Sequence, residues 1–298
     1  MKNQLTGTFS LFFATLIWGS AFIAQSVGME LIGPFTFQTI RCALAVLFLV
    51  PASFLTGRGK ASIEKWRSLQ LWKAGLICGC ALFVAASLQQ VGLVYTDAGK
   101  AGFITAMYIV LVPVLGLFLK RRPPKTAVFS ILLAVVGLYL LSCTGVSGIN
   151  KGDIYLMGCA LAYAVQITCV DRFAAAVDGI RLNCIQALVV TVLSVPFMLA
   201  TEVIDPANIA ACALPLCYAG VLSMGVAYTL QIVGQQHLEP TAASLIMSLE
   251  SVIAALCGWL ILKEVMTGWE LLGCGLVFAA VIISQLPDKR KDAPHEPA

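Results

Sequence analysis

The stretch TAASLIMSLESVIAALCGWLILKE, from Thr241 to Glu264, is apolar almost throughout, yet it carries Glu250 near its middle. An apolar run of this length is typical of a helix that crosses the bilayer, which needs about 20 residues. An ionised carboxylate in the middle of such a helix is strongly unfavourable if it faces lipid. Glu250 therefore has to face a cavity, find a partner or stay protonated.

The composition of the whole chain points to the same solvent. Of its 298 residues, 59% are hydrophobic and 11% are charged, whereas soluble domains carry about 25% charged residues. The mean hydropathy is +0.91, so we expect membrane lipids to surround most of the chain. The net charge of +4 is small and does not indicate a nucleic-acid partner. The eleven cysteines form no CxxC pair or Cys/His cluster, so we interpret them as packing residues and expect no metal and no cofactor.

Ten apolar runs are separated by charges, Pro and Gly, and they predict an all-α integral membrane protein with ten transmembrane helices. The runs lack the period-2 alternation of lipid-spanning strands. The fifth and tenth are short, and Pro113 and Pro196 are candidates for kinks. The predicted spans are Gly7–Val27, Pro34–Leu55, Leu71–Val94, Ala98–Leu119, Ala127–Cys143, Asp153–Ala175, Arg181–Ala200, Ile209–Gly234, Thr241–Leu262 and Trp269–Gln285.

The distribution of Lys and Arg predicts the orientation, because these residues collect in cytoplasmic loops. With the N-terminus inside, fifteen of the nineteen lie at the inner side and only Lys100, Lys151 and Lys263 lie outside. Arg41 lies within a span. We therefore expect a multi-pass protein of the cell (cytoplasmic or inner) membrane, with both termini in the cytoplasm.

The two halves of the chain resemble each other. The segment GTFSLFFATLIWGSAF, which begins at Gly7, aligns with GDIYLMGCALAYAVQI, which begins at Gly152. The segment that ends at Tyr108 aligns with the one that ends at Glu250. Because each half has five spans, an odd number, the second half enters the membrane in the opposite sense. We predict two inverted five-helix repeats, residues 1–146 and 147–286, followed by a disordered cytoplasmic tail, residues 287–298. Chance similarity between Leu-, Ala- and Gly-rich helices is the alternative.

Three segments resemble a known family, the ten-helix EamA-domain branch of the drug/metabolite transporter superfamily. They are IWGSAFIAQSVGMELIGPFTFQTIRCALA (Ile17–Ala45), TDAGKAGFITAMYIVLVPVLGLFLKRRPP (Thr96–Pro124) and PTAASLIMSLESVIAALCGWLILKE (Pro240–Glu264). The resemblance implies two inverted five-helix bundles around a central cavity, and transport of small organic molecules. Ser251 stands where the family often has proline, which leaves open whether the ninth helix kinks there.

Polar and aromatic residues inside the spans are the candidates for substrate binding or coupling, since inverted repeats place such sites near the membrane midplane. Glu250 could exchange protons, meet a cationic group of the substrate, or form a hydrogen bond that only locks two helices together. Arg41 could bind an anionic group, pair with Glu250, cap a broken helix, or extend to the outer interface. Trp18 and Tyr163 occupy matched positions and could stack on a ring or an ammonium group, or simply pack helices. The predicted set is Glu250, Arg41, Trp18, Gln38, Gln89, Tyr108, Tyr163 and Gln186.

The leading functional hypothesis is a secondary transporter that exports small organic metabolites or amphipathic compounds by alternating access. The sequence contains no Walker motif, so a substrate or ion gradient has to supply the energy, and protons are the candidate partner through Glu250. A non-transporting accessory membrane protein is the alternative. An integral-membrane enzyme is a weaker one, because no GxSxG, HExxH or Asp/His cluster occurs. The sequence does not predict an oligomeric state.

Overall fold

The computed structural model describes residues 2–55, 60–96, 98–121, 123–142, 150–261 and 266–285, and within them the chain is helical, without strands. The predicted tail and the span ends at Cys143 and Leu262 lie outside these residues. The elements are α1 (Lys2–Leu31), α2 (Pro34–Leu55), α3 (Lys60–Trp66), α4 (Leu69–Leu93), α5 (Ala98–Ala106), α6 (Tyr108–Phe118), α7 (Lys125–Ser142), α8 (Lys151–Ala174), α9 (Gly179–Thr201), α10 (Pro206–Ala211), α11 (Ala213–Cys217), η1 (Tyr218–Ala227), α12 (Tyr228–Gln235), α13 (Pro240–Met247), α14 (Leu249–Ile261) and α15 (Gly268–Ser284).

Eight helical stretches in the described residues are long and apolar enough to cross a membrane. They coincide with eight of the ten predicted spans, so the all-helical class is confirmed with eight candidate membrane spans, and the count of ten membrane helices stays a prediction. The remaining two apolar helices, Lys125–Leu141 and Gly268–Ser284, are shorter and match the fifth and tenth predicted spans. The eight are Gln4–Leu31, Pro34–Leu55, Leu69–Leu93, Gly99–Phe118, Lys151–Ala174, Gly179–Thr201, Ala213–Gln235 and Pro240–Leu260.

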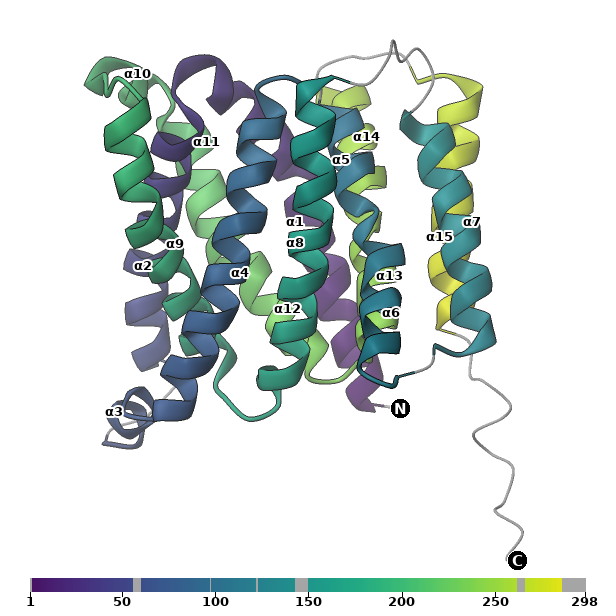
Figure 1. The fold of residues 1–298 in the computed structure, drawn as a ribbon, viewed down its shortest axis with the longest axis horizontal. Coiled ribbons are helices and arrows are strands. Elements are labelled where there is room, and N and C mark those ends of the chain that lie inside the picture. The colour runs from purple at the N-terminus through teal and green to yellow at the C-terminus, as the bar shows by residue number, and fades with distance from the viewer. Residues whose placement is uncertain are drawn as a thin grey trace, which may run out of the picture.

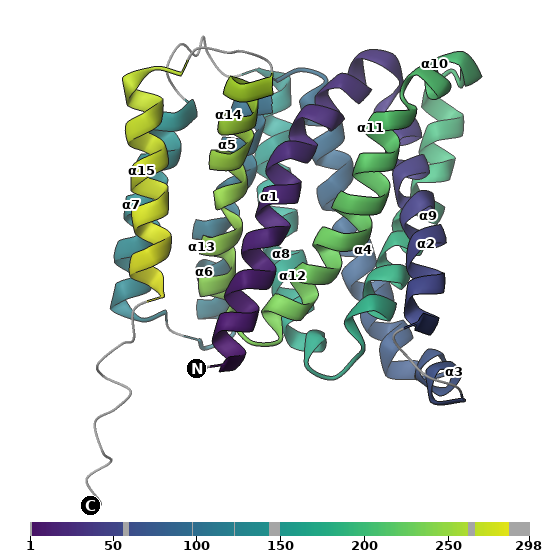
Figure 2. The same ribbon diagram turned by 180° about the vertical axis from the view of Figure 1, so that it is seen from behind.

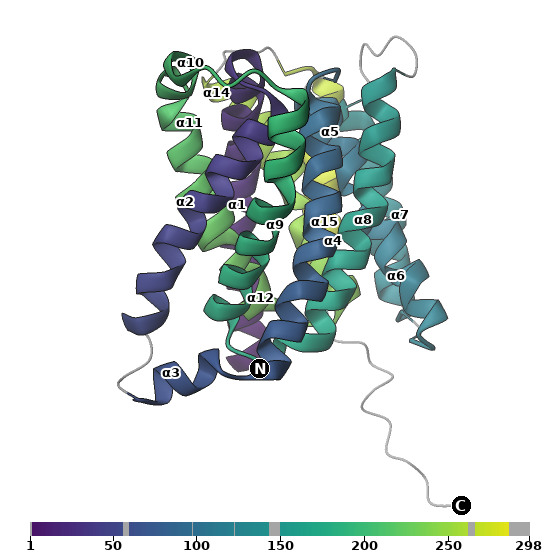
Figure 3. The same cartoon turned by 60° about the vertical axis from the view of Figure 1, so that its left-hand side comes forward.

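The long helices run roughly parallel to one another and form a bundle (Figures 1 and 2). The helices α7 and α15 pack together along one side of it. The short helix α3 lies across one end of the bundle, below α2 (Figure 3). Cysteines Cys42, Cys159 and Cys184 are buried in the apolar core, where they serve as small packing residues.

Three of the long stretches are not continuous α-helices. Met107 separates α5 from α6, Ser248 separates α13 from α14, and the π-helix η1 lies between α11 and α12. The break in the ninth predicted span answers the question left open at Ser251: the helix is interrupted three residues earlier, without a proline. Pro113 and Pro196 lie inside α6 and α9, so the break in the fourth span precedes its proline.

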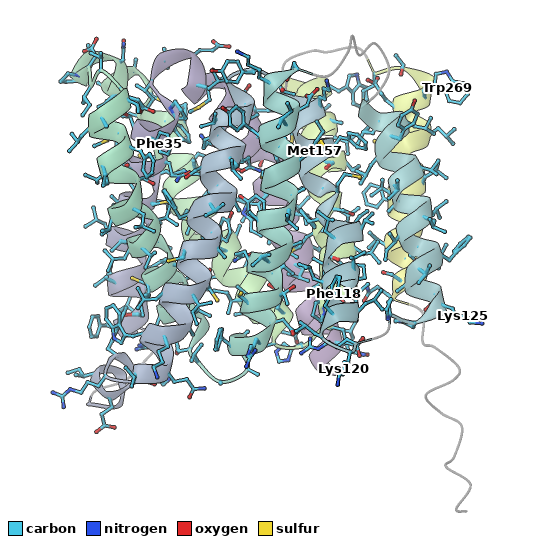
Figure 4. All side chains as sticks on the ribbon, in the orientation of Figure 1. Phe35, Phe118, Lys120, Lys125, Met157 and Trp269 are labelled. Atoms are coloured by element: carbon cyan, nitrogen blue, oxygen red, sulfur yellow. The ribbon has the colours of Figure 1, made fainter. Side chains whose placement is uncertain are left out.

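Basic residues gather at one end of the bundle. Lys120 and Lys125 lie at the end where α3 also lies, and Trp269 lies at the opposite end (Figure 4). Described parts of two loops predicted to face the cytoplasm, α3 and the segment around Lys120 and Lys125, therefore lie at the same end of the structure (Figures 1 and 4). That this end is cytoplasmic stays a prediction, based on the Lys and Arg distribution.

Ion pairs tie helices together at both ends. At the end away from α3, Lys100 Nζ lies 2.6 Å from Asp153 Oδ2. At the basic end, Asp178 Oδ2 lies 2.9 Å from Arg181 Nη1 and 3.2 Å from Lys65 Nζ. Burial raises the pKa of Asp178, but the Arg181 backbone N–H and the charges of Arg181 and Lys65 outweigh burial, and its net pKa is lowered. Asp178 also caps the N-terminus of α9, a position that favours a carboxylate.

Candidate functional site

A cavity lies inside the bundle, and residues from nine elements line it. Four of its aromatic residues are amphipathic, and both intramembrane charges singled out in the sequence contribute to it. The lining consists of Trp18, Phe22, Gln25, Arg41, Gln89, Tyr108, Tyr163, Ile167, Ser223, Tyr228, Gln231, Met247 and Glu250. A mixture of aromatic walls with a few convergent polar groups is typical of a small-molecule site.

The cavity is narrow in this conformation. The centres of water molecules can occupy about 30 Å³ of it, and one water needs about 10–15 Å³ measured in this way. The space therefore suits a few waters. Admission of an organic solute requires the surrounding helices to move apart.

Glu250 meets Tyr108 at two helix breaks. Tyr108 is the first residue of α6, and Glu250 is the second residue of α14. The Tyr108 hydroxyl donates a hydrogen bond of 3.0 Å to Glu250 Oε1. Both side chains are buried. The first turn of a helix favours a carboxylate, because unpaired backbone N–H groups give it partial positive charge.

Gly19 fixes the position of Glu250 relative to α1. A Cβ atom at this position would lie 2.5 Å from Ile253 Cβ and 2.7 Å from the Glu250 carbonyl oxygen. Only glycine therefore lets α1 approach the start of α14 so closely. The neighbouring Trp18 is held in the same cavity wall by this contact.

Tyr228 links the aromatic residues of the cavity. Its hydroxyl lies 3.1 Å from the Tyr163 hydroxyl, which donates a further bond of 3.1 Å to Gln89 Oε1. Its ring contacts Trp18 edge to face, with centroids 4.9 Å apart. The Trp18 indole N–H has no hydrogen-bond partner among the described residues. The contacts of Tyr228 therefore join aromatic residues of α1, α8 and α12 in the cavity wall.

Arg41 brings a positive charge into the cavity without an acid beside it. Its Nη1 donates a bond of 2.7 Å to Gln25 Oε1, and its Cζ lies 5.9 Å from the centre of the Phe37 ring. Its Nε is buried without a partner in the part of the chain that the structure describes. No carboxylate there lies within 4.0 Å of Arg41, so the hypothetical pair with Glu250 does not form in this conformation.

Two of the predicted site residues lie away from the cavity. Gln38 Nε2 donates to the hydroxyls of Ser87 and Ser194, 2.9 Å each, and so bridges α2, α4 and α9. Gln186 is two hydrogen bonds from the cavity: its Oε1 accepts from Gln166, whose own Oε1 accepts from the lining residue Gln231. The other six, Trp18, Arg41, Gln89, Tyr108, Tyr163 and Glu250, all line the cavity.

The sequence-based set omits several lining residues. Gln25 carries a detectable signal, because it is a polar residue in an apolar run and lies seven positions, two helical turns, after Trp18. Ser223 and Tyr228 lie in or directly after η1. A sequence reading that assumes 3.6 residues per turn does not place their side chains.

Sequence similarity to known proteins extends over almost the whole chain. An uncharacterized transporter of Archaeoglobus fulgidus is 34% identical over 285 residues, which cover 95% of this chain and 87% of the relative. The uncharacterized transporter YoaV of Bacillus subtilis is 25% identical, with 93% and 96% covered. The threonine/homoserine exporter RhtA of Escherichia coli K12 is 28% identical, with 92% and 89% covered.

The fold recurs in a solved structure. A crystal structure of another protein matches with a TM-score of 0.80 at 18% identity, and the match covers 96% of this chain and 99% of that one. The named relatives are transporters rather than enzymes, which confirms the prediction that the chain is a transporter and not an enzyme. The model of the EamA-like transporter family matches residues 5–143 and again residues 150–285. The chain therefore belongs to the EamA-like transporter family and is a membrane transporter.

Proposed function

We propose that the protein is a secondary transporter that exports small organic metabolites carrying a carboxylate group. Export proceeds by alternating access: ten membrane helices, arranged as two inverted five-helix repeats at residues 1–146 and 147–286, rock around the cavity. Both termini lie in the cytoplasm, and the protein resides in the cell membrane.

One observation carries the proposal: Arg41 and Glu250 line the same narrow cavity and form no ion pair with each other. A buried guanidinium without an acid partner is unfavourable by itself. It becomes favourable when an anionic group binds, because carboxylate and guanidinium form two parallel charge-assisted hydrogen bonds. The Nε of Arg41 and the indole N–H of Trp18 are buried without hydrogen-bond partners among the described residues, and in this proposal they become donors for the solute once the helices move apart.

Glu250 supplies the coupling in this proposal. The carboxyl group alternates between a charged form, when the cavity is open to water, and a protonated form, when helices close over it. The Tyr108 hydroxyl, 3.0 Å away, donates to the charged form. Proton exchange at Glu250 then drives solute movement in the opposite direction.

The inverted repeat is supported by the two family matches and by the paired helix breaks. The breaks at Met107 and Ser248 precede Tyr108 and Glu250, which are matched positions in the two halves of the sequence. Discontinuous helices at the midplane are typical of transporters with such repeats. The short helices α7 and α15 are the fifth and tenth spans in this arrangement.

The direction and the class of solute draw support from RhtA, a relative named as an exporter of threonine and homoserine. Both of these amino acids carry one carboxylate and one ammonium group. Arg41 suits the carboxylate, and Glu250 with the aromatic rings of Trp18 and Tyr228 suits the ammonium group.

Purified protein in liposomes tests the proposal. A panel of labelled amino acids and other carboxylates, with their decarboxylated analogues, is offered with and without a pH gradient. We expect counterflow of carboxylate-bearing solutes, net transport driven by the gradient, and no transport of the analogues. Equal transport with and without the gradient would reject proton coupling. Vesicles that move no solute under any gradient would favour the accessory role and overturn the proposal.

A further inference from the structure

The helix η1 is a π-helix of ten residues, Tyr218–Ala227, in the middle of a membrane span. The π-helix is rare, and it appears mostly as a single wide turn inserted in an α-helix at a functional site. A stretch of this length needs contacts that hold it open. The neighbouring helices α9 and α2 provide them.

Asn183 on α9 binds the backbone of η1 directly. Its side-chain Nδ2 lies 2.8 Å from the Met224 carbonyl oxygen, 3.0 Å from that of Gly225 and 3.0 Å from Thr229 Oγ1. The amide has two N–H groups for these three acceptors. In a π-helix each carbonyl accepts from the N–H five residues on instead of four, and Asn183 supplies further donors to two carbonyls near the C-terminal end of η1. The side chain is completely buried.

The packing of η1 on α2 fits the wide register. A Cβ atom at Gly220 would lie 2.8 Å from the Arg41 carbonyl oxygen, and one at Gly225 would lie 2.9 Å from Phe48 Cδ1. Both glycines thus face α2, although they are five residues apart. In an α-helix, with about 100° per residue, positions five apart point roughly 140° away from each other. The wider π turn brings both glycines to one face.

The register of η1 decides what the cavity contains. Ser223 lies within η1, and Tyr228 and Gln231 follow it on α12; all three line the cavity. Rewinding η1 as an α-helix would turn α12 about its own axis. Tyr228 would then lose its contacts with Tyr163 and Trp18.

We propose that Asn183 is a positioning residue that holds η1 in the π register and thereby presents Ser223, Tyr228 and Gln231 to the transported solute. Asn183 itself does not line the cavity. The inference rests on the proposed function, since it assumes that solute passes through this cavity. The register can nevertheless be measured without any transport assay.

Cysteine labelling in native membranes reads the register. Ser223 lines the cavity, whereas Leu222 is exposed at the outer surface of the bundle. The two reporter variants are therefore Ser223→Cys and Leu222→Cys. Each is placed in a background in which the exposed cysteines Cys80 and Cys217 are replaced by serine, and is treated with a small charged methanethiosulfonate. The same background without the added cysteine measures reaction at the remaining native thiols and is subtracted. We expect labelling at 223, through the conformations in which the helices move apart and open the cavity, and little at 222 while Asn183 is present.

Asn183→Ala removes the side-chain amide, and Asn183→Asp keeps its shape but replaces the N–H donors with a carboxylate oxygen. We expect labelling at 223 to fall about tenfold or more in either variant, a shift of about 1.4 kcal/mol, comparable with losing one or two hydrogen bonds. If the aspartate variant fails to fold, the alanine variant still gives the result. Asn183→Gln, which keeps the amide, should recover part of the labelling. Thr191→Val on the same helix, where the hydroxyl bonds only its own helix, is the matched control and should change nothing.

For an identified solute, the same variants should raise KM through the misplaced cavity residues and leave the amount of folded protein near normal. Unchanged labelling at both positions in Asn183→Ala would overturn the inference, even if the protein transports. Altered labelling in a protein that moves no solute would uphold the register and reject the proposed function. The two failures are therefore distinguishable.

Discussion

Two arginines are buried among these helices, and their surroundings are opposite. Arg181 is fully buried, lies 2.9 Å from Asp178, donates 2.7 Å to the Ser53 carbonyl oxygen and sits over the Trp66 ring. Arg41 is 4% exposed and has the neutral Gln25 as its hydrogen-bond partner. A carboxylate cancels one charge inside the protein, and no described carboxylate cancels the other. The first arrangement holds helices together, and in the proposed function a bound anion completes the second.

Replacing each arginine with methionine tests this difference, and we expect the larger loss of stability at Arg181. Arg181→Met keeps much of the side-chain volume but leaves the Ser53 carbonyl and Asp178 without their guanidinium partner. Removing one member of a buried ion pair costs about 3–5 kcal/mol, and we expect about 3, since Asp178 retains Lys65 and a backbone N–H. The midpoint of thermal unfolding in detergent measures the loss.

Arg121→Met is the control for this prediction, because Arg121 forms an exposed ion pair with Asp171 at the same end of the bundle. It should leave the unfolding midpoint nearly unchanged. If the two variants lost equal stability, burial of the Arg181 pair would not be what matters, and the contrast with Arg41 would lose its basis.

Arg41→Met should show the reverse pattern. Removing a buried charge that lacks an acid partner leaves stability unchanged or improves it. Carboxylate-bearing solutes lose a charge-assisted contact worth about 1.5–3 kcal/mol, so their apparent affinity should fall at least tenfold. Transport assays on the folded protein, with its unfolding midpoint measured in parallel, provide the check. A variant that unfolds like Arg181→Met would show that Arg41 is structural.

Glu250→Gln extends the comparison to the acid of the cavity. Glutamine retains an oxygen that accepts the Tyr108 hydrogen bond, so the fold and solute exchange should persist. Net transport driven by a pH gradient should be lost, because the side chain no longer exchanges a proton. Counterflow and gradient-driven uptake are measured in the same vesicles. Glu30→Gln, an exposed acid on α1, serves as control. Gradient-driven transport that survives in Glu250→Gln would place the coupling elsewhere.

The sequence predicts the depth of a residue better than its partner. The spacing of apolar runs places Arg41 and Glu250 within the membrane, and both lie in the cavity. Their partners depend on tertiary contacts: Gln25 approaches Arg41 from a different helix, and Tyr108 reaches Glu250 across two helix breaks. Neither break coincides with a proline, so the residue pattern offers no mark for it.

Gln38 shows the limit of the internal repeat as evidence for a site. Its matched position and its polarity predict a lining residue, yet it bridges Ser87 and Ser194 between helices. A buried amide satisfies its hydrogen bonds equally well against water, solute or another helix. Only the packing of the three helices decides among these, and a single sequence does not contain it.

The smallest loss of stability is expected at Lys65, the exposed partner of Asp178. The Lys65 side chain is 54% exposed, and its Nζ lies 3.2 Å from Asp178 Oδ2. Exposed ion pairs contribute about 0–1 kcal/mol, so Lys65→Ala should lower the unfolding midpoint slightly and leave transport intact. A loss as large as that in Arg181→Met would contradict this ranking.

Low pH separates the charge interaction between Lys65 and Asp178 from the packing of the Lys65 side chain. Because the pKa of Asp178 is lowered in the folded protein, its stabilising effect is complete above the unfolded value of about 3.9 and is lost as pH falls through the folded pKa. Lys65 contributes to that lowering. The stability difference between Lys65→Ala and the parent protein should therefore shrink as pH falls below about 4. A difference that stayed constant would mean that Lys65 acts through packing of its stem rather than through the charge of Asp178.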